Sequence, residues 1–233
     1  MDKYEHVTYA PGTYAWHINR RQRVYLRGLI RRAFPDLRPT LHDFACGTGR
    51  AIRNLDGLVW YAHGYDTSPD MLAKAAELGT EADLHTVATG GPVPQPVATD
   101  GPALVTMFRL LLNVDDDVRE RALAFAARAL PNAETGLLVV ENHGNRRSLR
   151  HLRARRHTGR RWFAELSHAQ VARLLRRHGF EVVARRGFSM LTPGWYDRPL
   201  LRPFARTADG LACRLPGSAG WAVNVVYVAR RTA

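Results

Sequence analysis

The sequence has few cysteines, almost no lysine and no long apolar run. Its 233 residues include two cysteines, Cys46 and Cys213, too few for the disulfide framework of a small secreted protein. No apolar stretch approaches the ~20 residues that a membrane-spanning helix needs, and the first residues lack the basic-then-apolar pattern of a signal peptide. We therefore expect a cytoplasmic protein with no membrane association, folded as one large domain.

The positive charge comes almost entirely from arginine. Lysine and arginine number 34 against 21 acidic residues, which gives a formal net charge of +13. Only Lys3 and Lys74 are lysines, so the other 32 cations are arginines. Because a GC-rich coding sequence produces such a skew, the charge alone is weak evidence for a nucleic-acid partner. It does suit an anionic small molecule, because arginine binds carboxylate and phosphate bidentately.

The stretch LHDFACGTGR, residues 41–50, is the most informative in the chain. A short apolar strand ends at Asp43, and the Gly47–Gly49 turn then opens a helix. The glycines allow a ligand to approach the backbone closely. A dinucleotide motif would need a third glycine where Ile52 stands, and no Gly-Lys-Ser/Thr of a P-loop is present. An acid directly before the turn is unsuited to a pyrophosphate but suits a ligand with an amino group.

A second acid lies at the end of the next expected strand. Residues 58–62, LVWYA, continue through residues 63–65 to Asp66. A carboxylate at this place can accept hydrogen bonds from both hydroxyls of a ribose. Asp43 and Asp66 together predict an adenosine-containing cofactor that lies across the carboxyl ends of two neighbouring parallel strands.

Residues 43–49 resemble motif I of the class I S-adenosylmethionine (SAM) methyltransferases, and residues 65–72, YDTSPDML, resemble their second motif. Ala45 stands where the first glycine of the usual triple is found. The resemblance extends over roughly residues 41–230 and implies a Rossmann-like α/β fold, a doubly wound sheet of about seven strands with one antiparallel terminal strand. It also implies SAM as cofactor, S-adenosylhomocysteine (SAH) as product and no catalytic metal. The implied cofactor-binding residues are Asp43, Ala45, Cys46, Gly47, Thr48, Gly49, Asp66, Thr67, Met71, Thr89, Phe108 and Arg109.

Hydrophobic periodicity and capping signals place the other elements. Helices are expected over residues 13–34 and 50–55, from Ser68, from Asp115 to Leu130, and from Ser167 to Gly179. Further strands are expected over residues 83–88, 103–108, 137–141, 180–184 and 223–228. We expect a single domain over residues 1–233, with an N-terminal cap (1–40), a SAM-binding half (41–142), and lid segments with the terminal strand pair (143–233).

Two segments exceed what the sheet needs. Residues 143–164 are rich in arginine, and residues 191–220 carry prolines among aromatic side chains. Insertions at the carboxyl edge of such a sheet build the walls of substrate sites.

Three residues are candidates for catalysis. Methyl transfer needs an acceptor lone pair about 3 Å from the methyl group in a site without water. His143 follows Glu141 and Asn142 at the end of a parallel strand, where α/β sites form, and is the candidate base; it could equally cap a loop. His17 and Tyr14, on the N-terminal helix, are weaker candidates and could equally be packing residues.

Several familiar methylation signatures are missing. Residues 108–113, FRLLLN, replace the Asp/Asn-Pro-Pro-Tyr/Phe of exocyclic-amine methylation, no Pro-Cys nucleophile is present, and two lysines cannot build a lysine-based ribose 2′-hydroxyl site. We predict methyl transfer to an oxygen or nitrogen of a small acceptor, which can be anionic, and we disfavour nucleic acid. By fold-level analogy, the short single domain with variable lids resembles tailoring enzymes of bacterial secondary metabolism. Two alternatives stay open: an RNA methyltransferase that uses the arginines of residues 146–161, and a SAM-binding protein without turnover.

Overall fold

A seven-stranded sheet forms the centre of the molecule. The computed structural model describes residues 8–148, 150–151 and 165–232, and in them the strand order is β3-β2-β1-β4-β5-β7-β6. Every ladder is parallel except those of β7, which runs antiparallel to both β5 and β6. The expected Rossmann-like sheet with one reversed strand is thus confirmed. The strands are β1 (Thr40–Phe44), β2 (Ala62–Asp66), β3 (Asp83–Thr86), β4 (Ala103–Met107), β5 (Gly136–Asn142), β6 (Phe180–Gly187) and β7 (Val225–Arg231).

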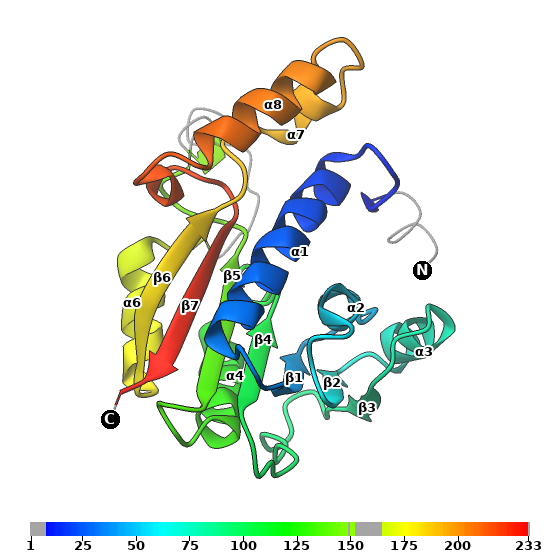
Figure 1. Ribbon diagram of the computed structural model, residues 1–233, viewed down its shortest axis with the longest axis vertical. Coiled ribbons are helices and arrows are strands. Elements are labelled where there is room, and N and C mark those ends of the chain that lie inside the picture. The colour runs from blue at the N-terminus through cyan, green and yellow to red at the C-terminus, as the bar shows by residue number, and fades with distance from the viewer. Residues whose placement is uncertain (1–7, 149, 152–164, 233) are drawn as a thin grey trace.

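Helices cover both faces of the sheet (Figure 1). One face packs against α1 (Tyr14–Ala33), α2 (Arg50–Leu55) and α3 (Pro69–Glu77), and the other against α4 (Asp116–Ala129) and α6 (His168–Arg177). Between β6 and β7 the chain forms α7 (Pro193–Tyr196), α8 (Arg202–Ala212) and the short 3-10 helix η2 (Ser218–Gly220). Figure 1 shows α7 and α8 beyond one end of the sheet, across from the N-terminal end of α1.

Side-chain caps fix the beginnings of three helices where the sequence predicts them. Ser68 accepts a hydrogen bond from the N–H of Met71, with Pro69 at the first helical position. Asp115 caps α4 in the same way, so the acidic run there is a helix N-terminus. Ser167 and Gln170 form the expected capping box of α6.

The second strand is shorter than the sequence suggests. The predicted strand over residues 58–61 is wrong, because Leu58 closes a turn on Leu55 and the ladder with β1 begins only at Ala62. Trp60 and Tyr61, which look like strand residues, are 69% and 60% exposed. The other strand boundaries differ from those expected by one to three residues.

The N-terminal helix belongs to the core rather than to a separate cap. Leu26 and Ile30 are buried among apolar residues of β1, β4 and α2. The side-chain amide of Gln22 donates to Glu141 Oε1 of β5 at 2.6 Å. The cap expected over residues 1–40 is therefore, over Tyr14–Ala33, a packed layer of the fold, because its apolar stripe is needed to cover the sheet.

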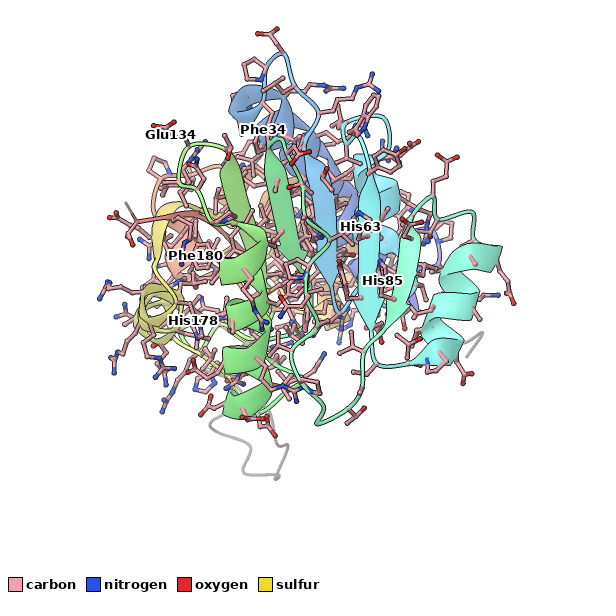
Figure 2. The ribbon with its side chains drawn as sticks, turned by 90° about the horizontal axis from the view of Figure 1, so that it is seen from below. Phe34, His63, His85, Glu134, His178 and Phe180 are labelled. Atoms are coloured by element: carbon pink, nitrogen blue, oxygen red, sulfur yellow. The ribbon has the colours of Figure 1, made fainter. Side chains whose placement is uncertain are left out.

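The histidines of β1–β3 pack against one another on the other face. The ring centroids of His63 and His85, on neighbouring strands, lie 5.6 Å apart (Figure 2), and the His63 ring centroid lies 5.3 Å from that of His42 on β1. Burial, reinforced by the two neighbouring histidines, lowers the pKa of His42 to about 4. The His42 ring is therefore a neutral packing group at neutral pH.

Candidate active site

The turn after β1 is fastened to the end of β2. The carboxylate of Asp66 accepts hydrogen bonds from the N–H groups of Gly47 at 2.7 Å and Ser68 at 2.9 Å. The N–H of Cys46 donates to the carbonyl of Tyr65 at 3.1 Å. The two sequence motifs therefore meet at one edge of the sheet. Each carboxylate oxygen of Asp66 keeps a further lone pair for a ligand hydroxyl.

The backbone of the turn is open on one side. Gly47 has a φ of +55°, and a Cβ placed on it would meet no described atom within 4 Å. A Cβ on Gly49, with a φ of +75°, would lie 2.5 Å from Thr80. Gly49 is thus required for packing, whereas Gly47 faces space in which a ligand can lie against the backbone. Ala45 adopts a φ of +60°, a conformation that costs a residue with a Cβ about 1–2 kcal/mol.

Asp43 is a buried acid beneath the turn. Its side chain accepts a hydrogen bond from the Thr106 hydroxyl at 2.6 Å, and the residue is 1% exposed. Burial raises the pKa of Asp43 to about 7, although Thr106 and the guanidinium of Arg50 oppose the rise. A ligand cation near this carboxyl would stabilise its charged form.

Two arginines and a tyrosine lie over the turn. The Cζ atom of Arg50, the first residue of α2, is 3.7 Å from the ring centroid of Tyr9. The Tyr9 hydroxyl accepts a hydrogen bond from Arg109 at 2.7 Å. Nη1 of Arg50 is buried and has no hydrogen-bond partner among the described residues. Sequence reasoning missed Arg50, although its place directly after Gly49 was an available signal.

Arg109 is held in a strained conformation at the end of β4. Its φ is +57°, and its N–H donates to Glu141 Oε2 at 3.2 Å. Strain of this kind at a strand end is common where a site needs a side chain in one direction.

His143 and Tyr14 carry buried polar atoms that have no partners among the described residues. Burial, together with the charges of Arg109 and Arg150, lowers the pKa of His143 to about 3, so its ring is neutral. Burial raises the pKa of Tyr14 to about 12, and the positive charge of Arg150 offsets part of this rise. The Ser189 hydroxyl is close to the Tyr14 phenol and also offsets part of this rise in pKa. It donates its hydrogen bond to Leu191 O, however, and the Tyr14 hydroxyl has no well-formed hydrogen bond with a described residue.

The structure thus brings two of the three catalytic candidates to one charged region. Arg150 donates to the carbonyl of His143 at 3.3 Å. Nδ1 of His143 and Oη of Tyr14 are both buried and unpartnered in the described part of the chain. Because buried polar groups are normally paired, these two atoms are places where a ligand would complete the hydrogen bonding.

His17 lies one helical turn after Tyr14 on α1, and both rings pack against Tyr196. The His17 ring centroid is 5.6 Å from that of Tyr196, and the residue lines a cavity between α1 and α8. Burial, and then the charges of Arg206 and three other arginines, lowers the pKa of His17 to about 4. The cavity that His17 lines contains no residue of the Gly47 turn.

The other expected cofactor residues follow strand ends at the same edge. Thr48 and Cys46 are buried within the turn. The remaining four are exposed or half-buried: Thr67, Met71, Thr89 and Phe108. Of the arginine-rich segment, five members lie outside the described residues: Arg153, Arg155, Arg156, Arg160 and Arg161.

A parallel sheet of this order, with a glycine turn and an acid at each of two neighbouring strand ends, defines an α/β protein that binds an adenosine-containing cofactor. Residues 17–185 match the family model described as "Methyltransferase domain". The chain belongs to this family of SAM-dependent class I methyltransferases, and its cofactor is SAM.

Solved structures with this fold include several methyltransferases. A possible histamine N-methyltransferase from Thermotoga maritima is 18% identical, with 91% of this chain and 90% of that chain covered and a TM-score of 0.59. Magnesium protoporphyrin IX methyltransferase from Synechocystis, with bound SAH, is 14% identical, with 94% and 84% covered and a TM-score of 0.57. The [4+2]-cyclase SpnF is 22% identical, with 90% and 80% covered and a TM-score of 0.57.

At these identities the structural likenesses show the fold alone. A comparison with curated protein sequences gives no match. Among the described residues, none of the helices has the length and apolar character to cross a membrane.

Proposed function

We propose that the protein transfers the methyl group of SAM to an oxygen or nitrogen of a small-molecule acceptor. The observation that carries this proposal is the contact between the Gly47 turn and Asp66, beside a region where His143 and Tyr14 leave buried polar atoms unpaired among the described residues. SAM, when bound, supplies an electrophilic methyl group on a sulfonium. The residues of the chain bind the cofactor, orient the acceptor and exclude water.

The residues around the turn fit each part of the cofactor. Asp66 accepts hydrogen bonds from the ribose hydroxyls, and the open backbone face of Gly47 accommodates the ligand beside it. Asp43 pairs with the amino group, whose charge lowers the raised pKa of this carboxyl. Arg50, whose Nη1 has no partner in the described part of the chain, binds the carboxylate. The adenine is enclosed by Thr67, Met71, Thr89 and Phe108.

On the acceptor side, His143 and Tyr14 orient the reacting group. Both are neutral at pH 7, and a histidine with a pKa of about 3 is a poor proton acceptor. Orientation by hydrogen bonds therefore suits these residues better than general-base action. The positive charges of Arg109 and Arg150 favour an anionic acceptor, whose lone pair is available without a base.

The biological setting belongs to the same proposal. Fold-level analogy supports a cytoplasmic tailoring enzyme of bacterial secondary metabolism. The segment whose arginines would bind RNA lies largely outside the described residues, so the RNA alternative gains no support from the contacts around the site.

The test is acceptor-dependent formation of SAH. Purified protein is incubated with SAM and a panel of small carboxylates, phenols and amines, and mass spectrometry follows SAH and the methylated acceptor. We expect SAH to accumulate only with certain acceptors, each of which gains one methyl group. Tight SAH binding without methylation of any acceptor would contradict the proposed transfer.

A second candidate is a SAM-binding protein that does not methylate. One structural neighbour, SpnF, is a [4+2]-cyclase, so the fold is found with another reaction. Replacing SAM by SAH in the assay separates the two, because conversion of a small molecule that continues with SAH cannot be methyl transfer.

A further inference from the structure

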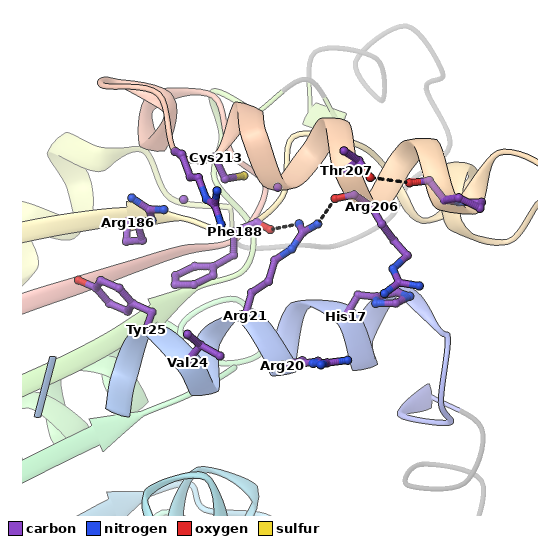
Figure 3. A pocket seen from close by; sticks show the side chains of 14 residues that line it. His17, Arg20, Arg21, Val24, Tyr25, Arg186, Phe188, Arg206, Thr207 and Cys213 are labelled. Atoms are coloured by element: carbon purple, nitrogen blue, oxygen red, sulfur yellow. Dashed lines mark hydrogen bonds between the residues drawn. The ribbon is translucent and has the colours of Figure 1, made fainter. Parts of the chain in front are cut away.

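The cavity that His17 lines lies on the side of α1 that faces away from α2. It has a volume of about 670 Å³, and its walls come from α1, from the end of β6 and from α8 (Figure 3). On α1 the lining residues recur at i, i+3, i+4, i+7 and i+8, which is one face of the helix, whereas Asn19 bonds to α2 from another face. Such a volume suits a ligand of ordinary cofactor or metabolite size.

The charge of this cavity is strongly positive and unbalanced. Among the residues that the structure describes, no acid lines it and five arginines do: Arg20, Arg21, Arg186, Arg206 and Arg214. The guanidinium group of Arg21 is already hydrogen-bonded, because it donates to Phe188 O, Arg206 O and Asp209. The guanidinium groups of the other four have no hydrogen bond or ion pair with the described residues.

Arg21 holds the three walls together. Its contacts join α1 to the end of β6 and to α8, as Figure 3 shows for the two carbonyls. Asp209 is fully buried and also accepts hydrogen bonds from Tyr196 and from the N–H groups of Met190 and Leu191. The cavity is therefore preorganised, and a ligand would not have to assemble it.

The remaining lining combines an unpaired nitrogen with an aromatic surface. Nε2 of His17 is buried in the cavity wall without a partner from the described residues. Tyr25 and Phe188 pack edge to face, with ring centroids 5.5 Å apart and an interplanar angle of 69°. An anionic group can bind the arginines and His17, while an apolar body packs against the aromatic rings of Tyr25 and Phe188.

We propose that this cavity binds a small organic anion with an aromatic or other apolar body, at a site separate from that of SAM. The guanidinium groups of Arg20, Arg186, Arg206 and Arg214 have no acidic partner among the described residues, and a bound anion would supply the opposite charge. Separation from the cofactor is inferred from α1, which lines the cavity with one face while Asn19, on another face, contacts α2, the helix that follows the Gly47 turn; no residue of that turn lines the cavity. The occupant and SAM should therefore bind together.

The test uses 1-naphthyl phosphate as probe and 1-naphthol as its neutral counterpart. Binding to the full chain is measured by calorimetry, with and without saturating SAH. The variant Arg186→Gln/Arg214→Gln removes two unpaired cavity charges. The matched control, Arg23→Gln/Arg173→Gln, removes the same charge from exposed positions of α1 and α6 that do not line the cavity.

We expect saturable binding of 1-naphthyl phosphate that weakens at least tenfold in the cavity variant and less than twofold in the control. SAH affinity should stay the same in both variants, which also separates this test from any failure of the proposed methyl transfer. Three results would overturn the inference: no saturable binding at about 1 mM probe, equal weakening by the control pair, or equal affinity for 1-naphthol. Displacement of the probe by SAH would also overturn it, because the site would then belong to the cofactor.

Discussion

Replacing Asp66 by asparagine tests the centre of the proposed cofactor site. Asparagine keeps the shape and one acceptor oxygen but puts an NH₂ group where the second oxygen was. In the free protein both oxygens accept backbone N–H groups, from Gly47 and Ser68. In the complex the same carboxylate would receive the ribose hydroxyls, and a hydrogen bond to a charged group is worth about 1.5–3 kcal/mol.

Loss of one such bond predicts SAH binding that is weaker by about tenfold to 150-fold. Isothermal titration calorimetry with SAH measures the change, and urea unfolding shows whether the variant is folded. Asp70→Asn is the matched control, because it removes the same charge from an exposed position in the first turn of α3. An Asp66→Asn protein that is folded and binds SAH within twofold of the wild type would refute the assignment.

Three further predictions follow from the same region. SAH affinity should rise about 20-fold from pH 5.5 to pH 7.5 as Asp43, whose pKa burial raises to about 7, becomes charged; calorimetry should show this rise lost in Asp43→Asn. Without ligand, the pH dependence has the opposite sign: the free energy of unfolding should fall between about pH 4 and pH 7, because Asp43 is already deprotonated in the unfolded chain but still protonated in the folded one. In urea unfolding, Asp43→Asn should show a flatter dependence of this free energy on pH. His143→Ala should lower kcat about tenfold or more with SAH affinity intact, while His143→Asn keeps most activity if orientation is the role; equal losses in both variants would favour base action. Ala45→Gly should stabilise the protein by about 0.5–1 kcal/mol in urea unfolding, because relief of the positive φ exceeds the entropy cost of glycine, and any destabilisation would contradict the strain.

The parts of the fold set by local chemistry were predictable from sequence. Ser68 with Pro69, and Ser167 with Gln170, specify helix starts through bonds within three residues, and the structure has them. The Gly47–Gly49 turn is equally local. Such features need no knowledge of what packs against them.

Features that depend on distant partners were not predictable. Trp60 and Tyr61 have strong strand propensity, yet they precede the ladder, although Tyr61 O accepts a hydrogen bond from the N–H of Leu41 and the N–H of Trp60 donates to Pro39 O. In the sequence, Asp209 looks like a surface residue of an amphipathic helix. It is a buried hydrogen-bond acceptor because Arg21 and Tyr196, which are distant in sequence or on another helix, pack against it. Likewise, nothing within ten residues of His17 indicates that it would line the cavity beside α8.

The charges at the carboxyl edge are separated in a way that bears on the proposed reaction. The acids lie at the ends of β1 and β2, where the proposed cofactor site is, and Arg109 and Arg150 lie beyond the ends of β4 and β5. Transfer of a methyl group from a sulfonium to an anion neutralises both charges. Such a reaction is faster when water is excluded, because neither product is charged at the reacting atoms. An amine acceptor, by contrast, would gain positive charge beside two arginines. Within the acceptor panel we therefore expect carboxylates and acidic phenols to be methylated faster than amines, and the reverse order would show that these arginines do not face the acceptor.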